Sequence, residues 1–142
     1  MSETTPTPRA VLDHMMRHDH FSRWMGIEVL DIAADYCKLR MQVRREMLNG
    51  FGIVHGGITF ALADSALAFA CNSDGRLSLA LDLSISYPRA AREGEVLTAE
   101  TSLRNKARKT ALYDVLVHNQ AGEAVALFRG TVYRTSRKVM EG

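Results

Sequence analysis

Apolar side chains recur at helical spacing in residues 8–18, at Val11, Leu12, Met15 and Met16. Thr7 followed by Pro8 is typical of a helix start, with a hydroxyl that caps the first turn and a proline that fits inside it. The pattern predicts a helix that starts at Pro8 and ends near His18. Residues 1–7 are small and polar, and we expect them to be loose.

Extended segments are marked by apolar residues at every second position. Residues 37–43 alternate clearly, with the apolar set formed by Cys37, Leu39, Met41 and Val43. The longest alternating run is 77–87, which predicts one buried face made of Leu77, Leu79, Leu81, Leu83, Ile85 and Tyr87. Weaker patterns place strands at 25–32, 95–104, 110–119 and 124–135, with a glycine-containing turn at 120–123.

The apolar segment 58–71 predicts a helix that begins near Gly56 and Gly57 and is apolar on every side except at Asp64. A helix of this kind is buried on all sides, and the sheet can cover only part of it, so we expect another chain to cover some of the rest. Strands that follow one another through short turns favour an antiparallel sheet. We therefore predict an α+β fold, the hot-dog architecture, in which a curved antiparallel sheet wraps one long central helix, with an additional N-terminal helix. Residues 1–142 are expected to form a single domain.

Composition narrows the class of protein without changing this fold. Apolar residues make up 46% and charged residues 24% of 142 residues, as in ordinary globular domains. A net charge of +2 argues against a nucleic-acid partner. The longest apolar segment, 58–71, is too short to span a membrane, and no signal-peptide pattern is present. Cys37 and Cys71 suit buried thiols in a reducing compartment, so we expect a cytoplasmic location.

The central helix carries the candidate chemistry. A buried carboxylate at Asp64 is costly unless it is paired or lines a cavity, and burial alone does not decide between these alternatives. Gly56 and Gly57 lie where the helix begins, where N–H groups lack partners and a ligand can approach the backbone closely. Such a helix end suits a developing oxyanion. Two nucleotide-binding motifs are absent here. The phosphate-binding motif G-x-x-x-x-G-K-S/T requires lysine where Ile58 stands, and the dinucleotide-binding motif G-x-G-x-x-G requires glycine where His55 stands.

Helix geometry separates these two features. Eight residues from Gly56 to Asp64 correspond to roughly 12 Å, whereas reacting groups must approach to about 3–3.5 Å. Two copies of the helix, antiparallel and side by side, would bring each Asp64 near the Gly56 of the other chain. We therefore expect a dimer with two shared active sites.

Residues 49–73, NGFGIVHGGITFALADSALAFACNS, closely resemble the signature of the hot-dog-fold acyl-CoA thioesterases. The similarity is greatest to the PaaI-type phenylacetyl-CoA thioesterases of aromatic catabolism, and it extends to residues 112–130. The resemblance implies hydrolysis of aryl- or arylacetyl-CoA, such as phenylacetyl-CoA or hydroxylated derivatives, to the free acid and CoA. It also implies a homotetramer built as a dimer of dimers, with no metal and no cofactor, since CoA is part of the substrate.

The resemblance further implies roles for four residues. Asp64 would be the general base or the nucleophile, and the Gly56 backbone N–H would polarise the thioester carbonyl. Asn49 would position the thioester or the water. His55 would contact the substrate sulfur or support the loop.

Further candidates concern substrate binding. Arg89 lies in a turn that borders the CoA entrance in the family, although Pro88 precedes it here where the family often has arginine, proline and a small residue. The basic run 104–109 fits either a charged hairpin turn or a CoA phosphate site, and the two readings stay open. Phe51, Phe60 and Trp24 are compatible with an aromatic acyl group, and they would suit a long aliphatic chain as well. The substrate-binding set is Gly57, Phe51, Phe60, Arg89, Arg108 and Lys109.

Two alternatives belong to other classes. A non-catalytic acyl-CoA sensor of the same fold would have no need for Asp64 and would usually carry an added DNA-binding module. A hot-dog hydratase or dehydratase would need a catalytic histidine on or near the helix, and His55 precedes the helix.

Overall fold

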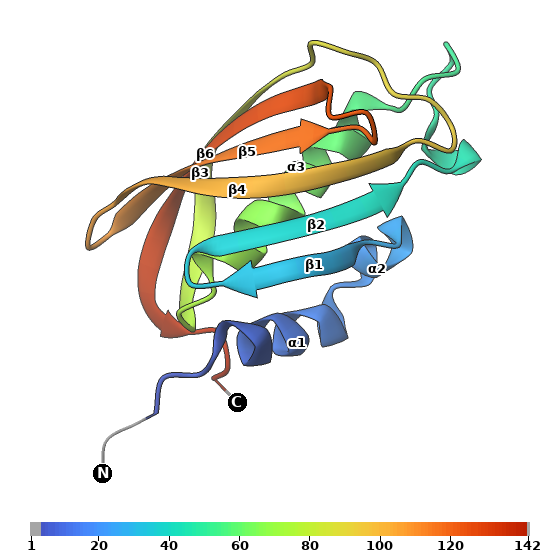
Figure 1. The fold of residues 1–142 in the computed structure, drawn as a ribbon. Helices are drawn as coiled ribbons and strands as arrows, with labels where there is room; N and C mark the ends of the chain where they lie inside the picture. Colours follow the sequence, from blue (N-terminus) through green and yellow to red (C-terminus); the bar gives the residue numbers. More distant parts are fainter. Residues whose placement is uncertain (1–3, 142) are drawn as a thin grey trace.

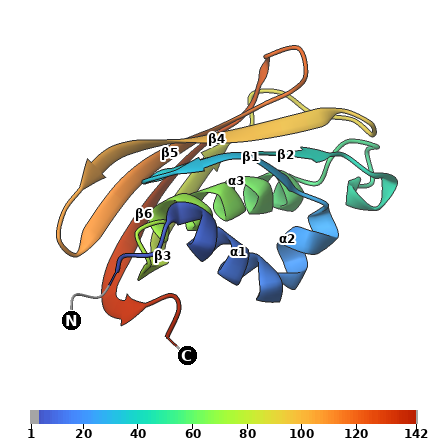
Figure 2. The same ribbon diagram turned by 60° about the horizontal axis from the view of Figure 1, so that its bottom comes forward.

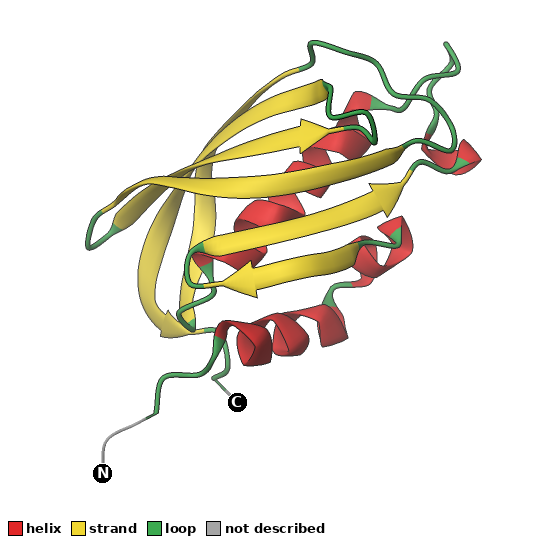
Figure 3. Ribbon diagram, in the orientation of Figure 1, coloured by secondary structure: helices red, strands yellow, loops and turns green. Residues whose placement is uncertain are grey.

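The computed structural model describes residues 4–141 and contains one six-stranded sheet in the order β1-β2-β4-β5-β6-β3. All neighbouring strands are antiparallel. The strands are β1 (Glu28–Ala33), β2 (Tyr36–Gln42), β3 (Arg76–Ser86), β4 (Val96–Lys106), β5 (Thr110–His118) and β6 (Ala124–Lys138). The sheet curves around the long helix α3 (Gly56–Cys71), as Figures 1 and 3 show. The predicted α+β hot-dog fold is confirmed.

The N-terminal part forms a third layer on the far side of α3 from the sheet (Figure 2). It consists of α1 (Pro8–His18) and α2 (His20–Met25). The predicted start of α1 is confirmed, since Thr7 Oγ1 accepts a hydrogen bond from the Ala10 N–H at 3.1 Å. The second helix was not predicted. Asp19 makes it possible, because its carboxylate caps α2 by accepting from the Ser22 N–H at 2.9 Å.

The core lies between α3 and the concave face of the sheet. The alternation predicted for β2 is confirmed, since Cys37, Leu39 and Met41 are all buried. Cys71, at the end of α3, is buried as well, and both cysteines are free thiols. Each fully buried aliphatic side chain stabilises the fold by about 1.5–3 kcal/mol. Within residues 4–141, no helix is both long enough and apolar enough to cross a bilayer.

The single buried face predicted for 77–87 is wrong. Ser78 is only 5% exposed, whereas Leu79 and Leu81 are 54% and 62% exposed. The pairing of β3 with β6 shifts register between Arg76 and Ser78 and again between Ala80 and Asp82, and each bulge changes which face the next side chains occupy. Asn72, at the end of α3, draws Ser78 inward, because its Oδ1 accepts from the Ser78 N–H at 2.7 Å.

Central helix α3 is not buried on all sides within one chain. Its side facing the sheet is covered, and the rest of the helix keeps a strip that one chain leaves exposed or partly buried; cover of this strip by another chain stays a prediction. That strip consists of residues that are exposed or only partly buried: Gly57, Phe60, Ala61, Asp64, Ser65 and Ala68.

Candidate active site

The N-terminal end of α3 offers one free backbone donor. His55 is the N-cap, and its Nδ1 accepts a hydrogen bond from the Gly57 N–H at 2.9 Å. The His55 carbonyl accepts from the Ile58 N–H, also at 2.9 Å. Among residues 4–141, nothing accepts from the Gly56 N–H. Helix ends of this type carry a positive dipole end, so this amide suits a partly negative oxygen.

A cavity of about 240 Å³ adjoins this amide. Apolar side chains from the loop before α3 and from β6 form one part of its wall, and polar groups form the rest. The lining residues are Asn49, Ile53, Val54, Gly56, Thr59, Tyr87, Arg89, Ala90 and Val125. The structure thus brings together three of the predicted site residues, namely Gly56, Asn49 and Arg89.

The amide of Asn49 is oriented by its own loop. Its Oδ1 accepts from the Phe51 N–H at 2.9 Å and from the Ile53 N–H at 3.4 Å. The oxygen is therefore occupied, and the Nδ2 group is the part of the side chain that can donate to a ligand. No acceptor for Nδ2 is present in the described chain.

Two lining residues were missed by the sequence analysis. The Tyr87 hydroxyl donates to the Gly56 carbonyl at 2.8 Å, and burial raises the pKa of this phenol. Thr59 is fully buried, and its Oγ1 has no hydrogen-bond partner among residues 4–141. A signal for Thr59 was available, because residues three apart in a helix share a face and Thr59 follows Gly56 by three.

Asp64 lies on the uncovered strip of α3 and makes no hydrogen bond or ion pair within residues 4–141. Burial raises the pKa of its carboxyl group, and the nearby charge of Asp19 raises it further. Two hydroxyl groups, those of Ser22 and Ser65, link Asp19 to the residue that follows Asp64. Its Oδ2 accepts from Ser22 Oγ at 2.8 Å, and Ser22 Oγ lies 2.8 Å from Ser65 Oγ.

Asp64 and Gly56 are not brought together within one chain. They lie on one straight helix and are separated by eight residues, or roughly 12 Å. A group held at the Gly56 amide is therefore beyond the reach of the Asp64 carboxylate of the same chain.

The aromatic candidates lie outside this cavity. Phe51 is 89% exposed at the tip of its loop. Phe60 packs edge-to-face on Phe128, with ring centroids 5.3 Å apart. Trp24 is also exposed, with the Arg44 guanidinium 5.0 Å from its ring centroid. Their contact with the acyl group stays a prediction.

Basic candidates occupy two different places. Arg89 lines the cavity and pairs with Glu123 at 2.9 Å on the surface. Arg108 and Lys109 lie in the turn between β4 and β5, at the end of the sheet opposite to the start of α3 (Figure 1). The Arg134 guanidinium fixes this turn by donating to the Ala107 carbonyl at 2.6 Å. Contact of these two residues with CoA stays a prediction that needs a neighbouring chain.

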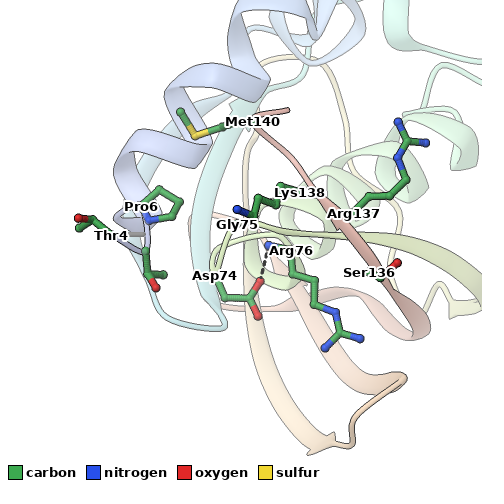
Figure 4. A pocket seen from close by; sticks show the side chains of 10 residues that line it. Thr4, Pro6, Asp74, Gly75, Arg76, Ser136, Arg137, Lys138 and Met140 are labelled. Carbon is green, nitrogen blue, oxygen red and sulfur yellow. Dashed lines mark hydrogen bonds between the residues drawn. The ribbon is translucent and has the colours of Figure 1, made fainter. Parts of the chain in front are cut away.

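A larger cavity, of about 640 Å³, lies near the two ends of the described chain (Figure 4). Its wall includes Pro6, Gly75, Met140 and several charged side chains, and the Asp74 carboxylate there accepts from the Arg76 N–H at 2.9 Å. None of the predicted site residues lines it. The part of the chain that the structure describes contains no cluster of three or more metal-binding side chains.

Comparison with known proteins gives consistent matches. Residues 51–126 match the family described as Thioesterase superfamily. The acyl-coenzyme A thioesterase PaaI of Escherichia coli K12 is 37% identical over 120 residues, covering 84% of this chain and 86% of that protein. The solved structure of the E. coli PaaI protein from the phenylacetic acid degradation operon superposes with a TM-score of 0.90 at 34% identity, covering 92% of this chain and 95% of that one. A hypothetical thioesterase protein from Streptococcus pneumoniae TIGR4, solved with coenzyme A, gives a TM-score of 0.76 at 28% identity, covering 79% and 90%.

Proposed function

The chain belongs to the thioesterase superfamily, and we propose that it is an acyl-CoA thioesterase of the PaaI type that hydrolyses aryl- and arylacetyl-CoA. The observation that carries the proposal is the free Gly56 N–H at the positive end of α3, which borders a cavity shared with the Asn49 amide. A thioester carbonyl oxygen bound in this cavity would thus have two possible donors from different elements to stabilise the negative charge that it gains.

In the proposed reaction the carbonyl oxygen accepts from the Gly56 N–H, and the Asn49 Nδ2 group orients the thioester or the water. As the carbonyl carbon becomes tetrahedral, the oxygen takes up negative charge that the fixed amide stabilises without reorganisation. The C–S bond then breaks, and CoA leaves as the thiolate and takes up a proton. No cofactor is required, because water and a carboxylate supply the chemistry.

Asp64 of a second copy supplies the carboxylate. A carboxylate whose pKa is raised by burial is a stronger base, when ionised, than one at its ordinary value. It either removes a proton from water or attacks the carbonyl carbon to form a mixed anhydride that water then opens. Label found in Asp64 after single-turnover hydrolysis in oxygen-18 water would support direct attack, since only a mixed anhydride that water opens at the Asp64 carboxyl carbon carries the label into the enzyme.

Assembly of two chains is proposed on the same grounds. Strand β3 is at an edge of the sheet, so one side of its eleven residues has no strand partner in the described chain. Exposed edge strands are templates for pairing with another chain. A two-fold axis at β3 would join two sheets and set two α3 helices antiparallel beneath them. Each Asp64 would then approach the Gly56 of the other chain, and two such dimers would make the tetramer.

Apolar acyl groups suit the cavity because Ile53, Val54 and Val125 form part of its wall. The Tyr87 ring adds an aromatic surface, and Arg89 places a cation where CoA would enter. The cavity of one chain is small for a ligand site, which agrees with a pocket completed by a second copy.

A thiol-release assay tests the function. The panel contains phenylacetyl-, hydroxylated arylacetyl-, benzoyl- and fatty acyl-CoA, and we expect the aryl substrates to give the highest kcat/KM. Asp64→Asn should lower kcat by about 10²–10⁴-fold. Asp13→Asn, an exposed aspartate on α1, is the matched control and should leave kcat unchanged. Wild-type turnover by Asp64→Asn would refute the role of Asp64, and no hydrolysis of any thioester would favour the non-catalytic acyl-CoA sensor.

A further inference from the structure

We propose that Tyr87 is a positioning residue that fixes the two-glycine end of α3 so that the Gly56 N–H is held toward the thioester carbonyl. The inference rests on the proposed function for its kinetic consequence. Its structural basis is the contact between the end of strand β3 and the first turn of α3.

The peptide that joins Gly56 to Gly57 is held at both ends. Its carbonyl accepts from the Tyr87 hydroxyl at 2.8 Å, and its N–H donates to His55 Nδ1 at 2.9 Å. Hydrogen bonds that share one peptide polarise each other, so the two side chains reinforce one another. Since His55 Nδ1 is an acceptor here, the neutral imidazole carries its proton on Nε2.

The same two side chains explain why both positions are glycine. A methyl group on Gly56 would lie 3.3 Å from Tyr87 Cζ and Oη, and one on Gly57 would lie 3.0 Å from His55 Nδ1. Contacts of this length are tighter than normal, so the phenol and the imidazole occupy the space that side chains would need. Two adjacent glycines are otherwise conformationally free, and they need such external contacts to hold one geometry.

Tyr87 connects this helix end to the sheet. It follows directly after β3, whose last residue, Ser86, pairs with Leu127 of β6. The backbone of Tyr87 thus continues directly from a strand that the ladder with β6 holds in place. The helix end is held from two independent elements, the sheet through Tyr87 and the 49–55 loop through His55.

This arrangement matters for catalysis because the Gly57 N–H is already occupied. Among the described residues of this first turn, only the Gly56 N–H is free to donate to the thioester oxygen. Its direction depends on the backbone angles of Gly56, whose carbonyl accepts from the Tyr87 hydroxyl. A prearranged donor stabilises the transition state more than the ground state, so loss of its alignment lowers kcat.

The test is Tyr87→Phe, which removes only the hydroxyl. We expect kcat for the best aryl substrate to fall about tenfold while KM changes by less than about twofold, since the Gly56 N–H loses the contact that aligns it for the transition state. Tyr133→Phe is the matched control. Tyr133 lies on strand β6 and is 40% exposed, against 47% for Tyr87. Its hydroxyl makes no hydrogen bond within residues 4–141. It should keep wild-type kcat and KM.

A second measurement does not depend on activity. In ¹⁵N–¹H correlation spectra the Gly57 amide should shift in Tyr87→Phe, because the carbonyl of its own peptide loses a donor, and it should stay in place in Tyr133→Phe. An unchanged Gly57 signal in Tyr87→Phe would overturn the proposal. A higher KM at unchanged kcat would overturn it as well, and so would a loss of activity that comes only from dissociation of the oligomer. If the wild type hydrolyses no thioester, the proposed function fails, whereas the Gly57 signal still decides whether Tyr87 holds the helix end.

Discussion

Two inactive variants should restore each other's activity if the active site is shared. Asp64→Asn removes the carboxylate. Asn49→Asp replaces the donor amide by a carboxylate, while its remaining oxygen can still accept from the Phe51 and Ile53 N–H groups, so the loop keeps its conformation. Each variant alone should be nearly inactive, because every site of its dimer lacks one of the two groups.

The size of the recovery follows from the geometry of α3. The roughly 12 Å between Gly56 and Asp64 along one helix excludes a complete site in one chain. In an equal mixture that is unfolded and refolded together, half of the dimers contain one chain of each kind. Each mixed dimer has one intact site and one site that lacks both groups. The mixture should therefore recover roughly a quarter of the wild-type activity.

The assay is thiol release from the best aryl-CoA substrate after refolding, with refolded wild type as the reference. A mixture of Asp64→Asn with the double variant Asp64→Asn/Asn49→Asp is the control, since no combination of these chains contains an intact site. Recovery in the control, or no recovery in the test mixture although mixed dimers form, would refute the shared site. Mixed dimers can be counted by giving the two chains different affinity tags.

Two further perturbations probe the surroundings of the site. Asp19→Asn should move the acidic limb of the pH–rate profile to lower pH. Activity rises as Asp64 ionises, and the charge of Asp19 adds to burial in raising the Asp64 pKa. Asp64 also interacts electrostatically with Cys71, and the control Asp13→Asn should leave the acidic limb in place. Thr59→Val should stabilise the fold by about 1 kcal/mol in urea denaturation, because it removes a buried hydroxyl without a partner at nearly constant volume; a less stable variant would show that this hydroxyl is hydrogen-bonded in solution.

Much of the fold was predictable because hydrophobic periodicity reflects burial directly. The bounds of α1, the start of α3 and the alternation of β2 followed from local sequence patterns. Strand β3 was mispredicted because its bulges depend on register against β6 and on Asn72 at the end of α3, which lie far away in the sequence. Helix α2 was missed because only six residues form it, too few for a periodic signal.

The site divides in the same way. Gly56 was found because a glycine pair before an apolar helix is a local pattern with a physical meaning. Tyr87 and Thr59 were not found. Tyr87 contacts Gly56 although the two residues are 31 positions apart in the sequence, and an unpartnered hydroxyl such as that of Thr59 cannot be recognised without coordinates. Phe51, by contrast, was selected by residue type, and its side chain points into solvent in a single chain.

Burial of both cysteines has a consequence for a protein that releases a thiol at each turnover. Burial raises the pKa of Cys37 and of Cys71 to about 12, so the thiolate is disfavoured for both at neutral pH. Thiolates are the species that exchange with disulfides, including oxidised forms of the released coenzyme. Burial thus keeps both sulfur atoms of the chain in the form that reacts least with such disulfides.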